Sequence, residues 1–89
     1  MNKVAIVTGA AQGMGLAIAK YFLENKINVL IADNNIEVLK YEYEKLLSQY
    51  NDNKILYFNL DITKTIDCNQ LPEQAFNKWS RLDILINCA

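Results

Sequence analysis

Four short stretches of the chain are almost continuously apolar and rich in β-branched residues. They lack the two-residue alternation that marks a sheet with one face in water. Uninterrupted apolar runs of this length are typical of strands that helices cover on both faces. We therefore predict four buried strands, over Lys3–Thr8, Asn28–Asp33, Lys54–Asn59 and Asp83–Asn87.

The segments between the first three runs carry apolar residues at helical spacing. Met14–Asn25 contains no helix breaker, and Asn35–Tyr50 places its apolar residues mostly three or four positions apart. Asn34 and Glu37 stand three residues apart at the start of the second segment. This spacing predicts a capping box with Asn34 as the cap, so both segments are predicted helices.

The third helix has a weaker pattern, because Pro72 stands in its first half. Proline fits the first turn of a helix and damages an interior turn, since it removes a backbone hydrogen bond. We therefore predict that this helix begins near Leu71 and that Thr63–Gln70 forms a looser turn. The side chains expected on its apolar face are Ala75, Phe76 and Trp79.

Predicted strands and helices alternate through the whole chain. This order is typical of α/β proteins, in which right-handed crossovers join parallel strands. The predicted fold is therefore an open parallel sheet of four strands with helices on both faces.

The composition indicates one small folded domain. The chain has 89 residues, of which 52% are apolar or aromatic and 21% charged, and this excludes disordered and low-complexity sequence. The net charge is −1 without clustering, so we expect no nucleic-acid partner and no membrane partner. No apolar run approaches the roughly 20 residues of a membrane span, and the N-terminus shows no signal peptide. These features predict a cytoplasmic protein.

The usual metal ligands and nucleophile pairs are missing from the sequence. It contains two cysteines, Cys68 and Cys88, without a CxxC pair, and no histidine. This removes the common zinc patterns and any Ser-His or Cys-His pair. We expect no metal site and two reduced thiols that pack as small hydrophobic side chains.

All three glycines fall in the segment that joins the first predicted strand to the first predicted helix. Gly9 would let the chain turn sharply, Gly13 would let backbone N–H groups approach a pyrophosphate, and Gly15 would let the helix pack closely. The N-terminus of the helix would offer unpaired N–H groups to the same anion. Because no Gly-Lys-Ser/Thr follows, the loop favours a dinucleotide over a nucleoside triphosphate. The alternative is a plain turn without a ligand.

Asp33 ends the second predicted strand, 18 residues after Gly15. An acidic side chain at about that distance accepts hydrogen bonds from the adenosine ribose of NAD and would repel the 2′-phosphate of NADP. No Arg or Lys stands at positions 10–12 or 34–35 to compensate this charge. The sequence therefore predicts NAD as the cofactor. The alternative is that Asp33 is only a helix N-cap or turn residue.

Three segments resemble the short-chain dehydrogenase/reductase family, in the family's order and over the whole chain. Residues 8–15 are similar to the family's TGxxxGxG loop, residues 60–63 to its LDVT segment, and residues 81–89 to RLDILVNNAG cut before its glycine. The resemblance implies a partial Rossmann fold with strand order 3-2-1-4. A narrower likeness to 15-hydroxyprostaglandin dehydrogenase-like members rests on the loop TGAAQGMG and the segment KILYF.

The resemblance also implies roles for individual residues. Asp61 would bind the adenine amine, and Ile62 would use its backbone N–H on the adenine ring. Asn87 and Ala89 would line the ribose and steady the fourth strand. With Asp33 on the ribose, the remaining cofactor-binding residues are expected in the loop: Gly9, Gln12, Gly13, Met14 and Gly15.

Three positions depart from the family pattern. Cys88 replaces the second Asn of NNAG, which would alter a hydrogen bond near the cofactor. Ser80 replaces the usual Gly before Arg-Leu-Asp, and Pro72 interrupts a helix that is normally unbroken. None of these changes removes the cofactor-binding pattern.

We expect no catalytic residue in this chain. Family members run to about 250 residues, and their Ser and Tyr-x-x-x-Lys follow the fourth strand, where this sequence ends. Two other pairs, Tyr41 with Lys45 and Tyr50 with Lys54, have the Tyr-x-x-x-Lys spacing. They lie on a predicted helix and in a loop, so we interpret them as surface residues.

The sequence thus predicts the NAD-binding part of a homo-oligomeric short-chain dehydrogenase. The full enzyme would interconvert a small-molecule alcohol and a carbonyl by hydride transfer. Two alternatives stay open: a truncated, non-catalytic nucleotide-binding or interaction module, and an unstable fragment. We expect the 89 residues alone to be inactive and poorly soluble, because the fourth strand would form an apolar edge.

Overall fold

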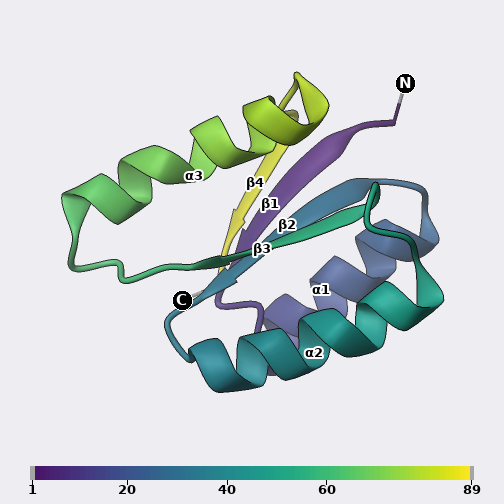
Figure 1. Ribbon diagram of the computed structural model, residues 1–89, viewed down its shortest axis with the longest axis horizontal. Helices are drawn as coiled ribbons and strands as arrows, with labels where there is room; N and C mark the ends of the chain where they lie inside the picture. Colours follow the sequence, from purple (N-terminus) through teal and green to yellow (C-terminus); the bar gives the residue numbers. More distant parts are fainter. Residues whose placement is uncertain (1, 89) are drawn as a thin grey trace.

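Four parallel strands form the sheet of the computed structural model, which describes residues 2–88 (Figure 1). The strands are β1 (Val4–Thr8), β2 (Asn28–Asp33), β3 (Ile55–Asn59) and β4 (Ile84–Asn87), in the order β3-β2-β1-β4. The helices between them are α1 (Gly13–Glu24), α2 (Ile36–Gln49) and α3 (Thr65–Trp79). The predicted fold class and strand order are confirmed, and every strand lies within one residue of its predicted bounds.

The helices cover both faces of the sheet: α1 and α2 lie on one face and α3 on the other (Figure 1). The central strand β1 is buried at every position, as its uninterrupted apolar sequence predicts. The largest fully buried side chains on the α1–α2 face are Val7, Val29, Ile31, Leu39 and Ile55. Those on the α3 face are Val4, Ile6 and Leu30.

β4 is an edge strand that pairs with β1, and Asp83 fixes its start. The backbone N–H of Asp83 donates to the Val4 carbonyl oxygen at 2.9 Å, and the Asp83 carboxylate accepts from the Val4 N–H at 2.9 Å. Arg81 donates two further hydrogen bonds of 2.8 Å to this carboxylate, which hold the pKa of Asp83 below its usual range. Leu85 is nevertheless 63% exposed, so the edge strand presents apolar surface on the α3 face.

The third helix begins at Thr65, so the looser turn predicted over Thr63–Gln70 is wrong for most of its length. Pro72 stands inside the helix and is exposed. The reason is tertiary, because Leu71 and Ala75 are buried against the sheet. Burial of one leucine side chain contributes about 1.5–3 kcal/mol, which offsets much of the ~3 kcal/mol cost of an interior proline.

The apolar face predicted for this helix is only partly correct. Ala75 is fully buried and Trp79 is partly buried, but Phe76 is 51% exposed. The Trp79 indole N–H donates to the Asn53 carbonyl oxygen at 2.7 Å, which ties the end of α3 to the turn before β3.

The N-cap of α2 is Asn35, whose side chain accepts a hydrogen bond from the Val38 N–H at 3.4 Å. The predicted capping box with Asn34 as the cap is therefore wrong by one residue. The cause is Asp33, whose carboxylate accepts from the Asn35 N–H at 3.0 Å and forms a turn before the helix begins. This turn moves the cap one residue along the chain.

Ser80 ends α3 in the left-handed conformation, with φ at 61° and its N–H bonded to the Phe76 carbonyl oxygen at 2.8 Å. Glycine is favoured at such helix ends because it has no Cβ atom. Ser80→Gly is therefore expected to raise the free energy of unfolding by about 0.5–1 kcal/mol, as measured by urea denaturation. Glu73→Gly inside the same helix is the control and should lower it by about 0.5 kcal/mol. A lower free energy of unfolding in Ser80→Gly would contradict the expectation that the left-handed conformation of Ser80 reduces stability.

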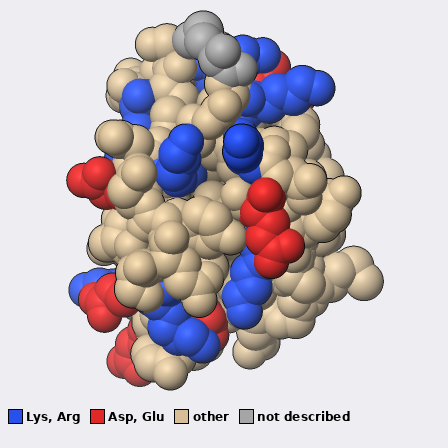
Figure 2. Space-filling model, turned by 90° about the vertical axis from the view of Figure 1, so that its right-hand side faces the viewer, with Lys and Arg blue, Asp and Glu red and all other residues tan. Residues whose placement is uncertain are grey.

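The surface carries charges of both signs. Figure 2 shows Lys and Arg side chains interspersed with Asp and Glu on the face that it presents. Across residues 2–88, no helix combines the length and the apolar character that a membrane crossing requires.

Candidate functional site

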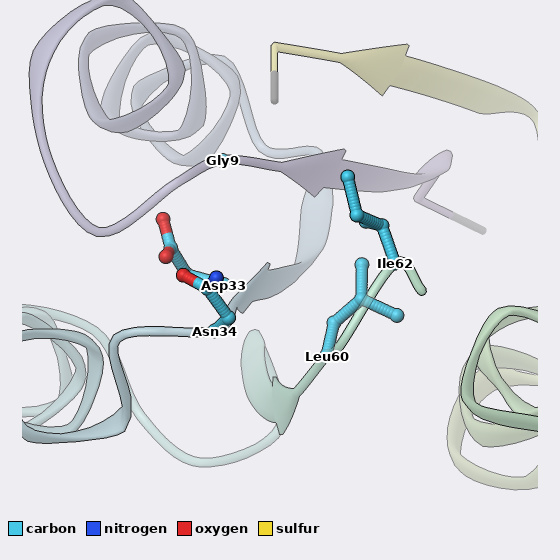
Figure 3. A pocket seen from close by; sticks show the side chains of 5 residues that line it. All are labelled: Gly9, Asp33, Asn34, Leu60 and Ile62. Atoms are coloured by element: carbon cyan, nitrogen blue, oxygen red, sulfur yellow. The ribbon is translucent and has the colours of Figure 1, made fainter. Parts of the chain in front are cut away.

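The candidate site lies where the carboxyl ends of β1, β2 and β3 meet at one edge of the sheet. The residues that follow these strands face a common cavity of about 60 Å³ (Figure 3). Such an edge is where open α/β sheets bind their ligands. The cavity is lined by Gly9, Asp33, Asn34, Leu60 and Ile62.

The glycine loop turns off β1 at Gly9, which has φ at 64°. Gly13 also has a positive φ, at 61°, and a Cβ atom there would meet nothing within 4 Å. A Cβ atom at Gly15 would overlap the Gly9 carbonyl oxygen and lie 2.8 Å from the Gly9 carbonyl carbon. The loop therefore needs glycine for its turn at Gly9, leaves open space beside Gly13, and has close packing at Gly15.

The N-terminus of α1 faces solvent beside this loop. Gln12 is its N-cap and makes no side-chain capping hydrogen bond, and the first turn contains no acidic residue. Gln12 is exposed, and Met14 is 75% exposed. An anion could therefore approach the first N–H groups of the helix without displacing a side-chain cap.

The carboxylate of Asp33 links the glycine loop to the start of α2. One oxygen accepts from the Ala11 N–H at 3.0 Å, and the other accepts from the Asn35 N–H at 3.0 Å. In Figure 3 the side chain of Asp33 lies near Gly9 and beside Asn34, and all three residues line the cavity. The alternative that Asp33 serves only as a turn residue accounts for the Asn35 contact but not for the bond to Ala11.

Asp61 and Ile62 follow β3 at the other side of the cavity. One Asp61 oxygen accepts from the Thr63 hydroxyl at 2.6 Å and from the Thr63 N–H at 3.0 Å, and these bonds lower the pKa of Asp61. Asp61 is therefore an ionised acceptor at neutral pH. Ile62 is 60% exposed and lines the cavity with its side chain, whereas Asp61 does not line it.

Asn87 lies at the end of β4, where its side-chain oxygen accepts from the Thr8 hydroxyl at 2.7 Å. This bond joins the last residue of β4 to the last residue of β1. Ala89, the other residue expected there, lies outside the described residues.

A second hollow, of about 230 Å³, lies between α3 and the β1–β4 side of the sheet. It shares Leu60 and Ile62 with the first cavity, so the two hollows adjoin. Cys68 lines it and is exposed, so the prediction that this thiol packs as a small hydrophobic side chain is wrong. Cys68 and Cys88 are both free thiols. The remaining lining residues are Thr8, Leu71, Leu85 and Asn87.

The structure brings Gly9, Asp33 and Ile62 together around the first cavity. Sequence reasoning missed Asn34 and Leu60, which complete the lining. Both directly follow residues at the ends of strands, and this position in a parallel sheet is the signal that could have identified them. Tyr41 and Lys45 contact each other on α2, with the ammonium 5.2 Å from the ring centre, and neither lines the cavity.

Comparison with known proteins agrees with this geometry. The sequence model of the family described as short chain dehydrogenase matches residues 3–89. An NAD-dependent glycerol dehydrogenase from Listeria innocua is 33% identical over 88 residues, which cover 99% of this chain and 33% of that protein. The chain thus spans about a third of the length of such relatives.

Solved structures share the fold. A short-chain dehydrogenase/reductase from Burkholderia phymatum, in complex with NAD, has a TM-score of 0.88 at 21% identity and covers 94% of this chain and 29% of its own. YwfH, an NADPH-dependent reductase, has a TM-score of 0.84 at 22% identity and covers 96% of this chain and 36% of its own. Because the family match extends from residue 3 to residue 89, this chain belongs to the short-chain dehydrogenase family of oxidoreductases.

Proposed function

We propose that this chain is the NAD-binding part of a short-chain dehydrogenase that interconverts an alcohol and a carbonyl by hydride transfer. The position of the Asp33 carboxylate carries the proposal. Asp33 lines the cavity, and its carboxylate is hydrogen-bonded to the glycine loop at Ala11. A fixed negative charge beside a pyrophosphate loop favours a ribose diol and opposes a 2′-phosphate.

The residues present fit an adenine dinucleotide. The space beside Gly13 is open where a pyrophosphate would approach the backbone. A carboxylate offers about four acceptor sites, and Asp33 uses two of them for Ala11 and Asn35. Acceptor sites therefore remain for the two hydroxyls of a ribose. The Ile62 side chain and the backbone at Gly9 would flank the adenine.

NAD would supply the chemistry by accepting or donating the hydride. The residues of this chain would bind and orient it. The loop and the N-terminus of α1 would hold the pyrophosphate, Asp33 would hold the ribose, and the ionised Asp61 would accept a hydrogen bond from the adenine amine. Asn87 would keep the ends of β1 and β4 together below the cofactor.

NADP is the alternative cofactor, and YwfH is an example of an NADPH-dependent neighbour. We favour NAD because the described residues that line the cavity include Asp33 and no basic side chain. The proposal includes a small-molecule substrate, a homo-oligomeric full-length protein and a cytoplasmic location. These three points, like the likeness to 15-hydroxyprostaglandin dehydrogenase-like members, stay predictions.

Isothermal titration of NAD into the full polypeptide that carries this chain tests the proposal. We expect saturable binding, and we expect Asp33→Ala to weaken it about 10- to 100-fold, because hydrogen bonds to a charged group contribute about 1.5–3 kcal/mol. Glu37→Gln is the control, since Glu37 is an exposed carboxylate in the first turn of α2 that does not line the cavity. A folded polypeptide that binds no NAD would refute the proposal.

The 89 residues produced alone are expected to show no dehydrogenase turnover and to aggregate. β4 places Ile84, Leu85 and Ile86 on an open edge, with Leu85 63% exposed. Such an edge is a template for association with other chains. Light scattering and thermal unfolding measure the association, and NADH absorbance measures turnover. A monomer with a cooperative transition would contradict the expected aggregation and favour the non-catalytic module, and turnover would contradict the expected inactivity.

A further inference from the structure

The Ala11 N–H lies in the buried part of the glycine loop. Ala10 and Ala11 are 0% and 1% exposed, so water does not reach their backbone groups. The Ala10 N–H donates to the Ala32 carbonyl oxygen at 3.1 Å, and the Ala11 N–H donates to the Asp33 carboxylate at 3.0 Å. The loop is therefore fastened to the end of β2 by two consecutive N–H groups.

We propose that Asp33 is also a positioning residue, which fixes the shape of the glycine loop before any cofactor binds. A buried N–H without a partner costs free energy comparable to a lost hydrogen bond. The Asp33 carboxylate is the partner of the Ala11 N–H. The consequence for pyrophosphate binding rests on the proposed function, whereas the effect on the loop does not.

A carboxylate suits this position because both of its oxygens accept hydrogen bonds. One oxygen of Asp33 accepts from Ala11 and the other from Asn35. An asparagine could accept from only one of these N–H groups and would turn its own amide donors toward the other. The two contacts therefore favour a carboxylate over an amide at this position, independently of any ribose.

The loop held in this way includes both positions that need a positive φ. Gly9 and Gly13 flank the fastened segment, with φ at 64° and 61°. Loss of the hydrogen bond between the Ala11 N–H and Asp33 would let residues 10–12 adopt other conformations. The glycines on either side, Gly9 and Gly13, permit such changes in the backbone. The ribose site and the pyrophosphate site thus share one carboxylate, so a change at Asp33 would affect both.

Hydrogen–deuterium exchange of the cofactor-free full polypeptide tests the effect on the loop. Asp33→Ala should speed exchange at Ala11 at least about tenfold, with β1 and β2 amides such as Ile6 and Leu30 unchanged. Asp33→Asn keeps the side-chain volume and should restore protection at only one of Ala11 and Asn35. Asp61→Asn is the matched control, because its carboxylate accepts from Thr63 and should leave Ala11 unchanged.

The affinities for adenosine and ADP test the consequence for the pyrophosphate. If Asp33 contacted only the ribose, Asp33→Ala would weaken both ligands equally, and loss of its negative charge would if anything favour ADP. If Asp33 positions the loop, Asp33→Ala should weaken ADP binding more than adenosine binding. The ratio of ADP affinity to adenosine affinity should then fall several-fold. A purely stabilising role in the fold would not lower this ratio.

The outcomes separate this inference from the proposed function. Unchanged exchange at Ala11 in both Asp33 variants would overturn the positioning role, even if the protein binds NAD. Faster exchange in a protein that binds no ADP would keep the positioning role and refute the proposed function. An ADP-to-adenosine ratio that is unchanged or higher in Asp33→Ala would overturn the link to pyrophosphate binding.

Discussion

Gly15→Ala is expected to remove NAD binding and to destabilise the fold as well. The new Cβ atom would overlap the Gly9 carbonyl oxygen, and it would lie 2.8 Å from the Gly9 carbonyl carbon and 3.2 Å from the Ala10 Cα. These are backbone atoms, so the strain cannot be relieved by a side-chain rotation. We expect a loss of about 3 kcal/mol in the free energy of unfolding, the upper end for overpacking.

Gly13→Ala is the matched variant that separates binding from folding. A Cβ atom at Gly13 meets nothing within 4 Å in this structure, so the only cost to the fold is its positive φ of 61°. That cost is about 1–2 kcal/mol. The methyl group would nevertheless fill the space that a pyrophosphate needs, so NAD affinity should fall far more than stability does.

Urea unfolding without cofactor and titration with NAD, on the same three proteins, measure the two effects. The unmodified protein should be the most stable, Gly13→Ala less stable and Gly15→Ala the least stable. Both variants should bind NAD poorly. Unmodified NAD affinity in Gly13→Ala would show that the pyrophosphate does not lie against this loop. Unmodified stability in Gly15→Ala would show that the loop can move away from α1.

The full polypeptide is expected to use NAD about 100-fold more efficiently than NADP, measured as kcat/KM. Asp33 lines the cavity, so its carboxylate would oppose a 2′-phosphate there, and juxtaposed like charges cost several kcal/mol. Asp33→Ala combined with Asn34→Arg should reverse the preference, because arginine binds phosphate oxygens with paired donors. Asn34 is the chosen position because it lines the cavity next to Asp33.

Two single variants control this experiment. Asp33→Ala alone should reduce the preference for NAD without creating high efficiency with NADP, since no cation is added. Lys40→Arg adds no new charge and changes an exposed residue of α2 that does not line the cavity, so it should leave the preference unchanged. Equal or higher efficiency of the unmodified protein with NADP would contradict the assignment of Asp33.

The strands and the first two helices could be predicted because their signals are local. The apolar runs around Ile6 and Leu30 are continuous in the sequence, and both residues are fully buried in the sheet. The three glycines identified the loop, since few other residues tolerate the positive φ found at Gly9 and Gly13. The family resemblance supplied the strand order, which apolar patterning alone does not contain.

The start of α3 and the cap of α2 differ from what the sequence pattern predicts. At Pro72 the sequence indicates a break, yet burial of Leu71 and Ala75 on the sheet keeps the helix continuous. At Asn34 the sequence indicates a cap, yet the turn closed by Asp33 moves the cap to Asn35. At α3 a contact with the sheet outweighs the propensity of the segment itself, whereas at α2 a local turn of Asp33 displaces the cap.

The sequence by itself determined the alternation of strands and helices, the glycine loop, and the acidic residue at the end of β2. These features follow from side-chain chemistry and backbone freedom at single positions. Only the tertiary structure decided that the Asp33 carboxylate meets the Ala11 N–H, which is 22 residues away along the chain. It also decided that Asn34, Leu60 and Ile62 share one cavity with Gly9. Parallel pairing of β1, β2 and β3 aligns their carboxyl ends, and this alignment brings residues that are distant in sequence into contact.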